Sequence, residues 1–243
     1  MHFIVLTVLK RVTIGSLEHV LPIGIAVLLA YLLIQFNKQT SNYKNKRLVF
    51  NGLAVFVSLS VMSFHMYHIF FESYDIKTDL PLYLCSLIAL VIPVFSYYRK
   101  YWMFEILVFW IIAGTLQGVI TPDIAIGFPS FDYFRYWIVH LGLLTIIFYA
   151  IFVFKMRPKF KSVFVSFFAL QCYVLFIIVI NFLLDANYFY LNEKPKSASL
   201  LDYFGDWPYY IIIAQLLIIP LFLMVYLGFH LFVNRSSNTI QKP

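Results

Sequence analysis

Long apolar runs separated by short polar loops constrain this chain more than any other feature. Each of the seven runs is near the roughly 20 residues that a helix needs to cross a bilayer. Because only 12% of the 243 residues are charged and 62% are hydrophobic, the chain has too little polar surface for a soluble protein. We therefore predict an all-α polytopic membrane protein, a bundle of seven transmembrane helices that forms a single domain over residues 1–243. The runs are about Val20–Phe36, Leu48–Phe71, Leu80–Tyr98, Trp102–Ile120, Tyr133–Phe154, Val163–Leu184 and Tyr209–Val233.

The distribution of lysine and arginine among the loops predicts the orientation of the bundle. Loops after the first, third, fifth and seventh runs hold 4, 2, 4 and 2 of the 18 basic residues. Only one of the 11 acidic residues, Glu105, falls on that side. Basic loops stay cytoplasmic, so we expect the N-terminus outside and the C-terminus inside. The net charge of +7 therefore reflects topology, and we expect no nucleic-acid partner.

The residue usage also predicts a location. Frequent Lys, Asn, Ile, Phe and Tyr are typical of an AT-rich bacterial genome. We therefore expect a multi-pass protein of the bacterial plasma membrane.

The third run opens with a cysteine close to the start of a predicted helix. Asp79 is a residue type that caps helices, and Pro81 is tolerated in a first turn. If the helix begins at Leu80, Cys85 lies just over one turn inside it, about 7 Å along the axis. This places a thiol near the positive end of a helix, at the edge of the apolar layer.

Several polar residues from other runs are predicted to lie at the depth of Cys85. Polar groups within a bilayer are costly and usually face the interior of the bundle. We therefore expect a cavity in the outer half of the bundle into which these side chains converge. They are His19, His65, His68, Gln117, His140 and Asn181.

Each of these residues also has a plain structural interpretation. A cysteine in a membrane helix is ordinarily a packing residue, which is how we interpret Cys172. Gln117 and Asn181 are typical of residues that hydrogen-bond between helices. His65 and His68 lie three apart on one helical face, a spacing that can hold a metal, but no third ligand with matching geometry accompanies them. We therefore predict no metal and no other cofactor.

Cys85 and His140 together predict chemistry on an ester. A cysteine attacks as the thiolate, and a nearby histidine can take its proton. A helix N-terminus favours the anion modestly, but apolar surroundings oppose ionisation, so a base is required. His140 is the best-placed base by depth, and Asp123 or Asp132 could orient it. In the outer leaflet the available esters belong to lipids or lipoproteins.

Three stretches of sequence give the chain a resemblance to a known family. They are Leu80-Pro81-Leu82-Tyr83-Leu84-Cys85; Ala113-Gly114-Thr115-Leu116-Gln117 with Thr121-Pro122-Asp123, Phe128-Pro129 and His140; and Asn187-Tyr188 with Lys194-Pro195, Ser199-Leu200-Leu201-Asp202, Gly205 and Trp207-Pro208-Tyr209. With these, the chain resembles the YwaF-type bacterial integral membrane proteins, which are related to the animal transmembrane protein 164 acyltransferases. The resemblance implies a seven-helix fold and phospholipid-linked acyl transfer. Cys85 and His140 match the cysteine and histidine of that family.

We therefore expect a membrane-embedded acyltransferase that moves a fatty acyl chain from a phospholipid through a thioester on Cys85, with His140 as the base. Membrane phospholipids are the expected partners, as acyl donor or acceptor. Two alternatives stay open: a lipid hydrolase with the same Cys/His pair, and a lipid-binding or transport protein without covalent chemistry. The expected substrate-binding residues are His19, His65, His68, Gln117, Thr121, Asp123, Asn187 and Trp207.

Overall fold

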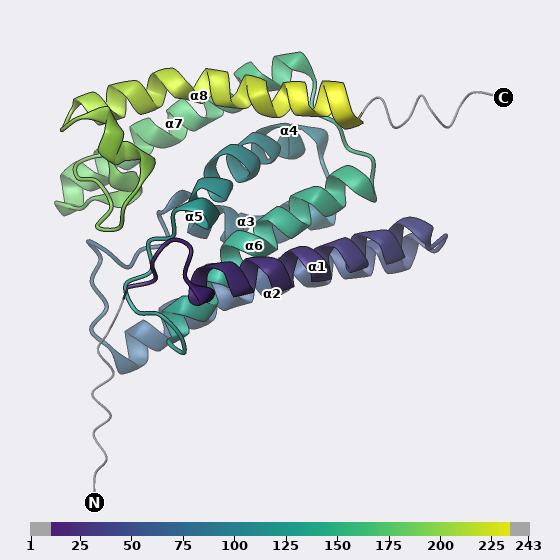
Figure 1. The fold of residues 1–243 in the computed structure, drawn as a ribbon, viewed down its shortest axis with the longest axis horizontal. Coiled ribbons are helices and arrows are strands. Elements are labelled where there is room, and N and C mark those ends of the chain that lie inside the picture. The colour runs from purple at the N-terminus through teal and green to yellow at the C-terminus, as the bar shows by residue number, and fades with distance from the viewer. Residues whose placement is uncertain (1–10, 234–243) are drawn as a thin grey trace, which may run out of the picture.

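The computed structural model describes residues 11–233, and this part of the chain is helical and has no β-strand (Figure 1). Six helical segments are long and apolar enough to cross a membrane, whereas α3, with 15 residues, is shorter. The helices are α1 (Leu17–Gln39), α2 (Tyr43–Phe71), α3 (Leu84–Tyr98), α4 (Tyr101–Phe109), η1 (Trp110–Thr115), α5 (Leu116–Ile120), α6 (Phe131–Phe152), α7 (Phe160–Leu184), η2 (Tyr188–Tyr190), η3 (Leu200–Phe204), α8 (Tyr209–Gly228) and η4 (Phe229–Val233).

Helix α6 forms the centre of the bundle, and most of its side chains are buried. It packs against α2, which also packs against α3, while α7 packs against α4 and α8. In Figure 1, α7 and α8 lie along the top, α1 and α2 along the bottom, and α4 and α6 between them. The outermost helices, α1 and α8, bury few side chains and expose apolar ones such as Leu28 and Leu216. Exposed apolar surface of this extent is typical of a helix that faces lipid.

The third apolar run forms a shorter helix than the sequence predicts. Helix α3 begins at Leu84, and its N-cap residue, Tyr83, makes no side-chain capping hydrogen bond. Asp79 does not cap this helix, because its carboxylate accepts a hydrogen bond of 2.9 Å from the backbone N–H of Asp75 in the preceding loop. Cys85 is therefore the second residue of α3 and lies in its first turn, not beyond it.

The fourth run contains a turn that sequence patterns do not reveal. Between α4 and α5 the backbone is π-helical from Trp110 to Thr115, with one continuous helical path from Tyr101 to Ile120. A π-turn holds more residues than an α-turn, so the residues after it face a different direction from an α-helical continuation. Trp110 also anchors this turn to α7, because its indole N–H donates to the carbonyl of Ser166 at 3.2 Å.

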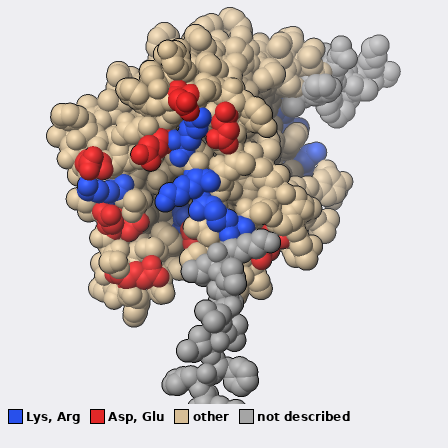
Figure 2. All heavy atoms as spheres, turned by 60° about the vertical axis from the view of Figure 1, so that its left-hand side comes forward, with Lys and Arg blue, Asp and Glu red and all other residues tan. Residues whose placement is uncertain are grey.

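The two ends of the bundle carry different connections. We call one the loop end, because it holds residues 72–83, 121–130 and 185–208; the basic end holds the short connections at residues 40–42, 99–100 and 153–159. Figure 2 shows acidic and basic side chains intermixed on the face at the loop end. Four ion pairs lie at this end: Arg11–Asp123, Lys77–Asp185, Arg135–Asp132 and Lys194–Asp206. The orientation of these ends in a membrane stays a prediction.

Candidate functional site

Cys85 lies near the loop end and is partly buried. Its Sγ atom lies 3.5 Å from the Oγ1 atom of Thr115, the last residue of η1, which is fully buried. Because no side chain caps α3 through Tyr83, the partial positive charge of the helix N-terminus is available to groups beside the first turn. A helix N-terminus favours a thiolate modestly, whereas burial opposes it, so ionisation of Cys85 requires a base.

His140 is a buried residue in the middle of α6, and its contacts define its protonation pattern. Its Nδ1 atom lies 2.8 Å from the carbonyl oxygen of Tyr136, and a carbonyl can only accept. The proton of the neutral ring is therefore on Nδ1, and Nε2 carries the lone pair. The Tyr136 ring stacks on the His140 ring with centroids 3.9 Å apart. The basic nitrogen faces Gly118, because a Cβ atom built on that glycine would lie only 2.8 Å from Nε2.

Cys85 and His140 both contact the short segment from the last residue of the π-turn, Thr115, to Gly118 in α5. Cys85 contacts Thr115, and His140 contacts Gly118, three residues further on. Residues three apart in a helix lie side by side on one face. No hydrogen bond joins the cysteine directly to the histidine within residues 11–233, so the two predicted catalytic residues are linked through this shared face. Neither Asp123 nor Asp132 hydrogen-bonds the His140 ring, which the Tyr136 carbonyl orients instead.

Asp123 is a junction between segments that are far apart in the sequence. Its carboxylate pairs with Arg11 and accepts a hydrogen bond of 3.0 Å from the hydroxyl of Tyr190. Its backbone N–H donates to the hydroxyl of Tyr136 at 3.3 Å. Burial, together with the Asp123 charge, raises the pKa of Tyr190, so this hydroxyl keeps its proton as a donor. Asp123 thus ties the segment before α1 and the loop after α7 to the start of the loop after α5.

His19 fastens α1 to α5 and uses both ring nitrogens to do so. Its Nδ1 accepts from the backbone N–H of Gly15 at 2.9 Å, and its Nε2 donates to the carbonyl of Val119 at 2.8 Å. The side chain is buried. Both ring nitrogens of His19 are therefore engaged by backbone groups that hold α1 against α5.

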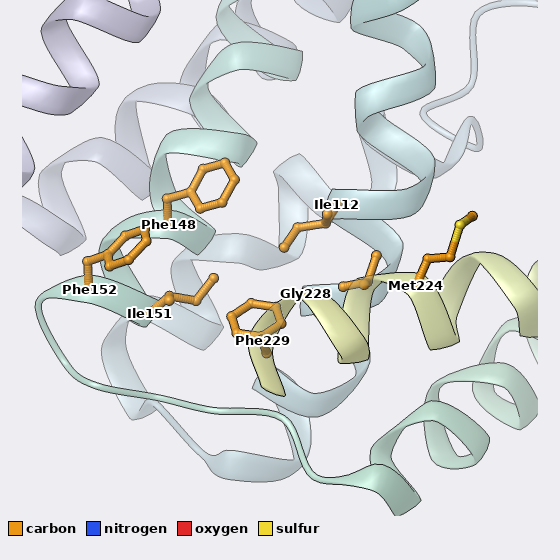
Figure 3. Close-up of a pocket in the computed structure, with 8 residues that line it drawn as sticks. Ile112, Phe148, Ile151, Phe152, Met224, Gly228 and Phe229 are labelled. Atoms are coloured by element: carbon orange, nitrogen blue, oxygen red, sulfur yellow. The ribbon is translucent and has the colours of Figure 1, made fainter. Parts of the chain in front are cut away.

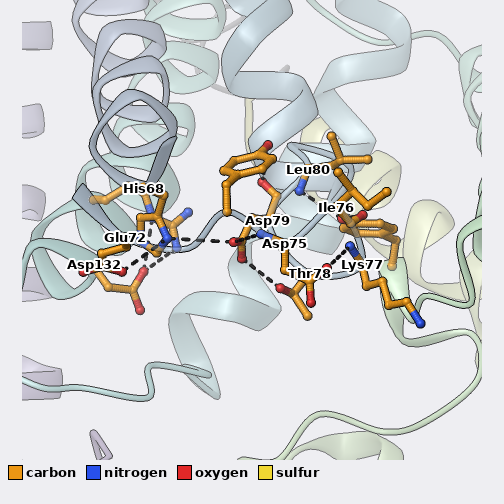
Figure 4. Close-up of polar contacts among 12 residues, drawn as sticks. His68, Glu72, Asp75, Ile76, Lys77, Thr78, Asp79, Leu80 and Asp132 are labelled. Atoms are coloured by element: carbon orange, nitrogen blue, oxygen red, sulfur yellow. Dashed lines mark hydrogen bonds and ion pairs between the residues drawn. The ribbon is translucent and has the colours of Figure 1, made fainter. Parts of the chain in front are cut away.

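His65 and His68 lie near the end of α2. Figure 4 shows His68 beside the loop that precedes α3. The Nδ1 atom of His68 lies 3.4 Å from the carboxylate of Glu72 and 3.9 Å from that of Asp79. Both ring nitrogens of His65 are buried and have no hydrogen-bond partner among residues 11–233. The same part of the chain contains no group of three His, Cys, Asp or Glu residues that could hold a metal ion.

Arg135, near the start of α6, lies against the end of α2. Asp132 holds its guanidinium at 2.5 Å, and the guanidinium stacks over the Phe64 ring at 4.2 Å. Arg135 immediately precedes Tyr136, whose carbonyl orients the His140 ring.

The other predicted substrate-binding residues mostly organise the backbone at the loop end. The hydroxyl of Thr121 donates to the carbonyl of Gln117 at 3.0 Å, where α5 ends, while the Gln117 side chain makes no hydrogen bond within residues 11–233. Asn187 accepts from two backbone N–H groups five and six residues later, at 2.9 and 3.1 Å. Trp207 is mostly exposed, and its indole N–H donates to a backbone carbonyl of the same loop at 3.2 Å.

The loop after α7 lies over the start of α3. Asn181 accepts from the backbone N–H of Tyr188 at 2.8 Å and donates to its carbonyl at 2.9 Å, so it serves this loop and not, as expected, a neighbouring helix. The Tyr188 hydroxyl accepts from the backbone N–H of Leu80 at 2.9 Å. The ring of Tyr83 packs against those of Tyr188 and Tyr190, with both centroid distances 5.5 Å. The segment before Cys85 is therefore held by tyrosines from this loop.

An apolar groove of about 240 Å³ lies toward the basic end of α6 (Figure 3). Along α6, its nearest lining residue, Phe148, is eight residues beyond His140, about 12 Å by helical rise. The groove offers hydrocarbon contact but no reacting group. Its lining residues are Ile112, Phe148, Ile151, Phe152, Met224, Val225, Gly228 and Phe229.

Comparison with protein-family models shows which family this chain is related to. The model described as the TMEM164 family matches residues 14–226, which is most of the chain. The chain belongs to the TMEM164 family. No curated protein and no solved structure matches it significantly. Membership confirms the resemblance drawn from the sequence, and together with the six long apolar helices it identifies a multi-pass membrane protein.

In this TMEM164-family chain, four residues beside the predicted pair were not expected as site residues. Thr115 ends the π-turn and Gly118 follows it, and no sequence pattern signals this turn, although Thr115 lies in a stretch that carries the family resemblance. Tyr136 lies one helical turn before His140, a spacing that places both on one face of α6. The four are Thr115, Gly118, Tyr136 and Arg135.

Proposed function

We propose that this protein is an acyltransferase that moves a fatty acyl chain from a phospholipid to a second lipid through a thioester on Cys85. One observation carries the proposal: Cys85, in an uncapped first turn, and His140, with an unprotonated Nε2, both contact the Thr115–Gly118 face. A nucleophile and a base that contact the same face of small residues form an arrangement suited to covalent catalysis. TMEM164-family membership supports a membrane substrate.

In the first half-reaction, Nε2 of His140 takes the proton of the Cys85 thiol. The thiolate attacks the ester carbonyl carbon of the donor, and a C–S bond forms. When the tetrahedral intermediate collapses, the C–O bond to the glycerol breaks, and the departing alkoxide takes the proton from the imidazolium. The products are a lysophospholipid and the acyl-enzyme.

In the second half-reaction, a hydroxyl group of the acceptor lipid replaces the departed lysophospholipid. His140 takes the proton of that hydroxyl, and the oxygen attacks the thioester carbonyl. The C–S bond breaks, the sulfur leaves as a thiolate and takes the proton back from the imidazolium. With water as the acceptor, the same steps would release a free fatty acid.

The loop end is where we place the lipid headgroup. Ester bonds of glycerolipids lie at the boundary between hydrocarbon and headgroups. The charged side chains at the loop end suit a position at this boundary. Of the predicted substrate-binding residues, His65 fits best, because its two buried ring nitrogens have no hydrogen-bond partner within residues 11–233. The acyl chain would lie along the apolar helices, where each buried methylene contributes about 0.8 kcal/mol.

We place the protein in the plasma membrane of a bacterial cell, with the loop end outside. The alternation of basic and acidic loops supports this orientation. The donor would then come from the outer leaflet.

The acyl-enzyme provides a direct test. Purified protein incubated with a phospholipid and a lysophospholipid acceptor is examined by intact mass spectrometry before and after neutral hydroxylamine, which cleaves thioesters. We expect a hydroxylamine-sensitive acyl adduct on the wild type and on Cys172→Ala, and none on Cys85→Ala. His140→Ala should form the adduct at least 100-fold more slowly, whereas His230→Ala, at the basic end, should behave as wild type.

Radiolabelled acyl chains then separate transfer from hydrolysis. Label on the acceptor lipid supports the acyltransferase, and label in free fatty acid alone identifies a hydrolase. If lipid remodelling persists without any adduct on Cys85, even in His140→Ala, the covalent mechanism is wrong.

A further inference from the structure

The hydroxyl of Thr115 differs from that of other threonines in the helices of this protein. A threonine in or just after a helix commonly bonds the carbonyl oxygen four residues earlier. Thr115 makes no such bond, and within residues 11–233 its one partner is the sulfur of Cys85, at 3.5 Å. The threonines that do follow the rule are Thr40, Thr121 and Thr145.

The position of Thr115 explains why its hydroxyl is left for the sulfur. It is the last residue of the π-turn, where the regular α-helical relation to the carbonyl four residues earlier is broken. It is also fully buried, so no solvent competes for its hydroxyl. A buried hydroxyl with one partner is expected to keep that partner, because an unmade hydrogen bond is costly there.

We propose that Thr115 is a catalytic residue whose hydroxyl binds the reacting sulfur of Cys85 in both of its protonation states. This inference rests on the acyl-transfer function proposed above. In the resting state the thiol donates its S–H to Thr115 Oγ1. Once Nε2 of His140 has taken that proton, the hydroxyl turns and donates its own O–H to the thiolate.

The second of these hydrogen bonds is the stronger. A hydrogen bond to an ion is roughly twice as strong as one between neutral groups. It therefore favours the thiolate over the thiol and assists both the attack on the ester and the departure of the sulfur from the thioester. The hydroxyl itself is neither consumed nor ionised, so the balance of each half-reaction is unchanged.

Alkylation of Cys85 by iodoacetamide measures this role without any lipid substrate. The full-length protein is used in detergent, with Cys172→Ser so that Cys85 is the one thiol. The rate of alkylation is followed by intact mass from pH 6 to pH 10. Thr115→Val removes the hydroxyl and keeps the shape, Thr115→Ser keeps the hydroxyl, and Thr145→Val is the control for loss of a helical threonine hydroxyl.

We expect Thr115→Val to alkylate at least tenfold more slowly at pH 8 and to reach its half-maximal rate about 1 to 2 pH units higher. Thr115→Ser and Thr145→Val should follow the wild-type profile. A loss of packing alone would not move the midpoint in this way. Equal profiles for wild type and Thr115→Val would overturn the inference, as would a wild-type thiol that does not react below pH 10.

The acyl-enzyme assay separates this result from the proposed function. A shifted alkylation profile together with no acyl adduct on the wild type would retain the role of Thr115 and reject acyl transfer. An adduct that forms equally fast on Thr115→Val, with unchanged alkylation, would retain acyl transfer and reject the role of Thr115.

Discussion

At the scale of single residues, the basic nitrogen of His140 has room because its neighbour has no side chain. A Cβ atom on Gly118 would lie 2.7 Å from Cδ2 and 2.8 Å from Nε2 of the histidine, closer than real Cβ contacts occur. The ring cannot easily turn away, because Tyr136 stacks on it and accepts the Nδ1 hydrogen bond through its carbonyl. The glycine thus sets the geometry of the base without taking part in the chemistry.

We therefore expect Gly118→Ala to displace the His140 ring and to lower the rate of acyl-enzyme formation at least tenfold. Gly52→Ala is the matched control, because nothing lies within 4 Å of a Cβ atom built on this glycine of α2. Alanine is favoured over glycine in a helix by about 1 kcal/mol, so the control should be equally active and slightly more stable to heat. Wild-type kinetics in Gly118→Ala would show that the glycine does not position the base.

At the scale of elements, the end of α7 depends on one amide side chain. Asn181 is buried, and it satisfies both the N–H and the carbonyl of Tyr188 in the loop that lies over α3. Through the Tyr188 hydroxyl, the same loop binds the N–H of Leu80, ahead of Cys85. The position of the first turn of α3 is thus coupled to the end of α7.

Asn181→Ala is expected to destabilise the protein by about 1 to 3 kcal/mol for each of the two backbone groups that it leaves buried and unpaired. For a chain of this size, each kcal/mol lowers the melting temperature by about 2 to 4 °C. Thermal unfolding in detergent measures the change. Asn45→Ala, at an exposed position in the first turn of α2, is the control and should melt like the wild type. Identical melting of the two variants would contradict a structural role for Asn181.

At the scale of the whole molecule, contacts between distant segments assemble the loop end. Arg11, before α1, and Tyr190, after α7, both reach the carboxylate of Asp123. Lys77, before α3, pairs with Asp185, after α7, at 2.8 Å. The basic end, by contrast, has short connections. This asymmetry is expected if the loop end binds the proposed substrate and the basic end sets the orientation in the membrane. The charges predict that the basic end is cytoplasmic.

Single cysteines at exposed positions test that orientation. In a background without Cys85 and Cys172, Ser41→Cys marks the basic end and Ala198→Cys the loop end. Neither native side chain makes a hydrogen bond among the described residues. An impermeant thiol reagent should label position 198 in intact cells and position 41 only after lysis. The opposite labelling pattern would show that the bundle has the inverted orientation, with the proposed site in the inner leaflet.

The sequence by itself determined the helical class and the apolar runs, and it singled out the pair of residues proposed to carry the chemistry. Runs near 20 residues with few charges have one stable solution in a bilayer, because only helices satisfy their own backbone there. Cys85 and His140 could be selected as a pair because topology fixes depth at 1.5 Å per residue. Six long helices appear near the predicted bounds, and the family match agrees with the stretches that suggested it.

The tertiary structure alone decided the rest, because these features depend on contacts between distant residues. Tyrosines from α7 and its loop hold the segment before Cys85 out of the helix, although its local sequence favours a cap at Asp79. Asp123 and His19 looked free for substrate, but Tyr190 bonds the Asp123 carboxylate, and the backbone of Val119 and of the nearby Gly15 bonds the His19 ring. The π-turn changes the direction in which Thr115 and Gly118 face. Hydrophobic periodicity does not reveal this turn, because its residues are apolar on every side and one extra residue leaves the pattern unchanged.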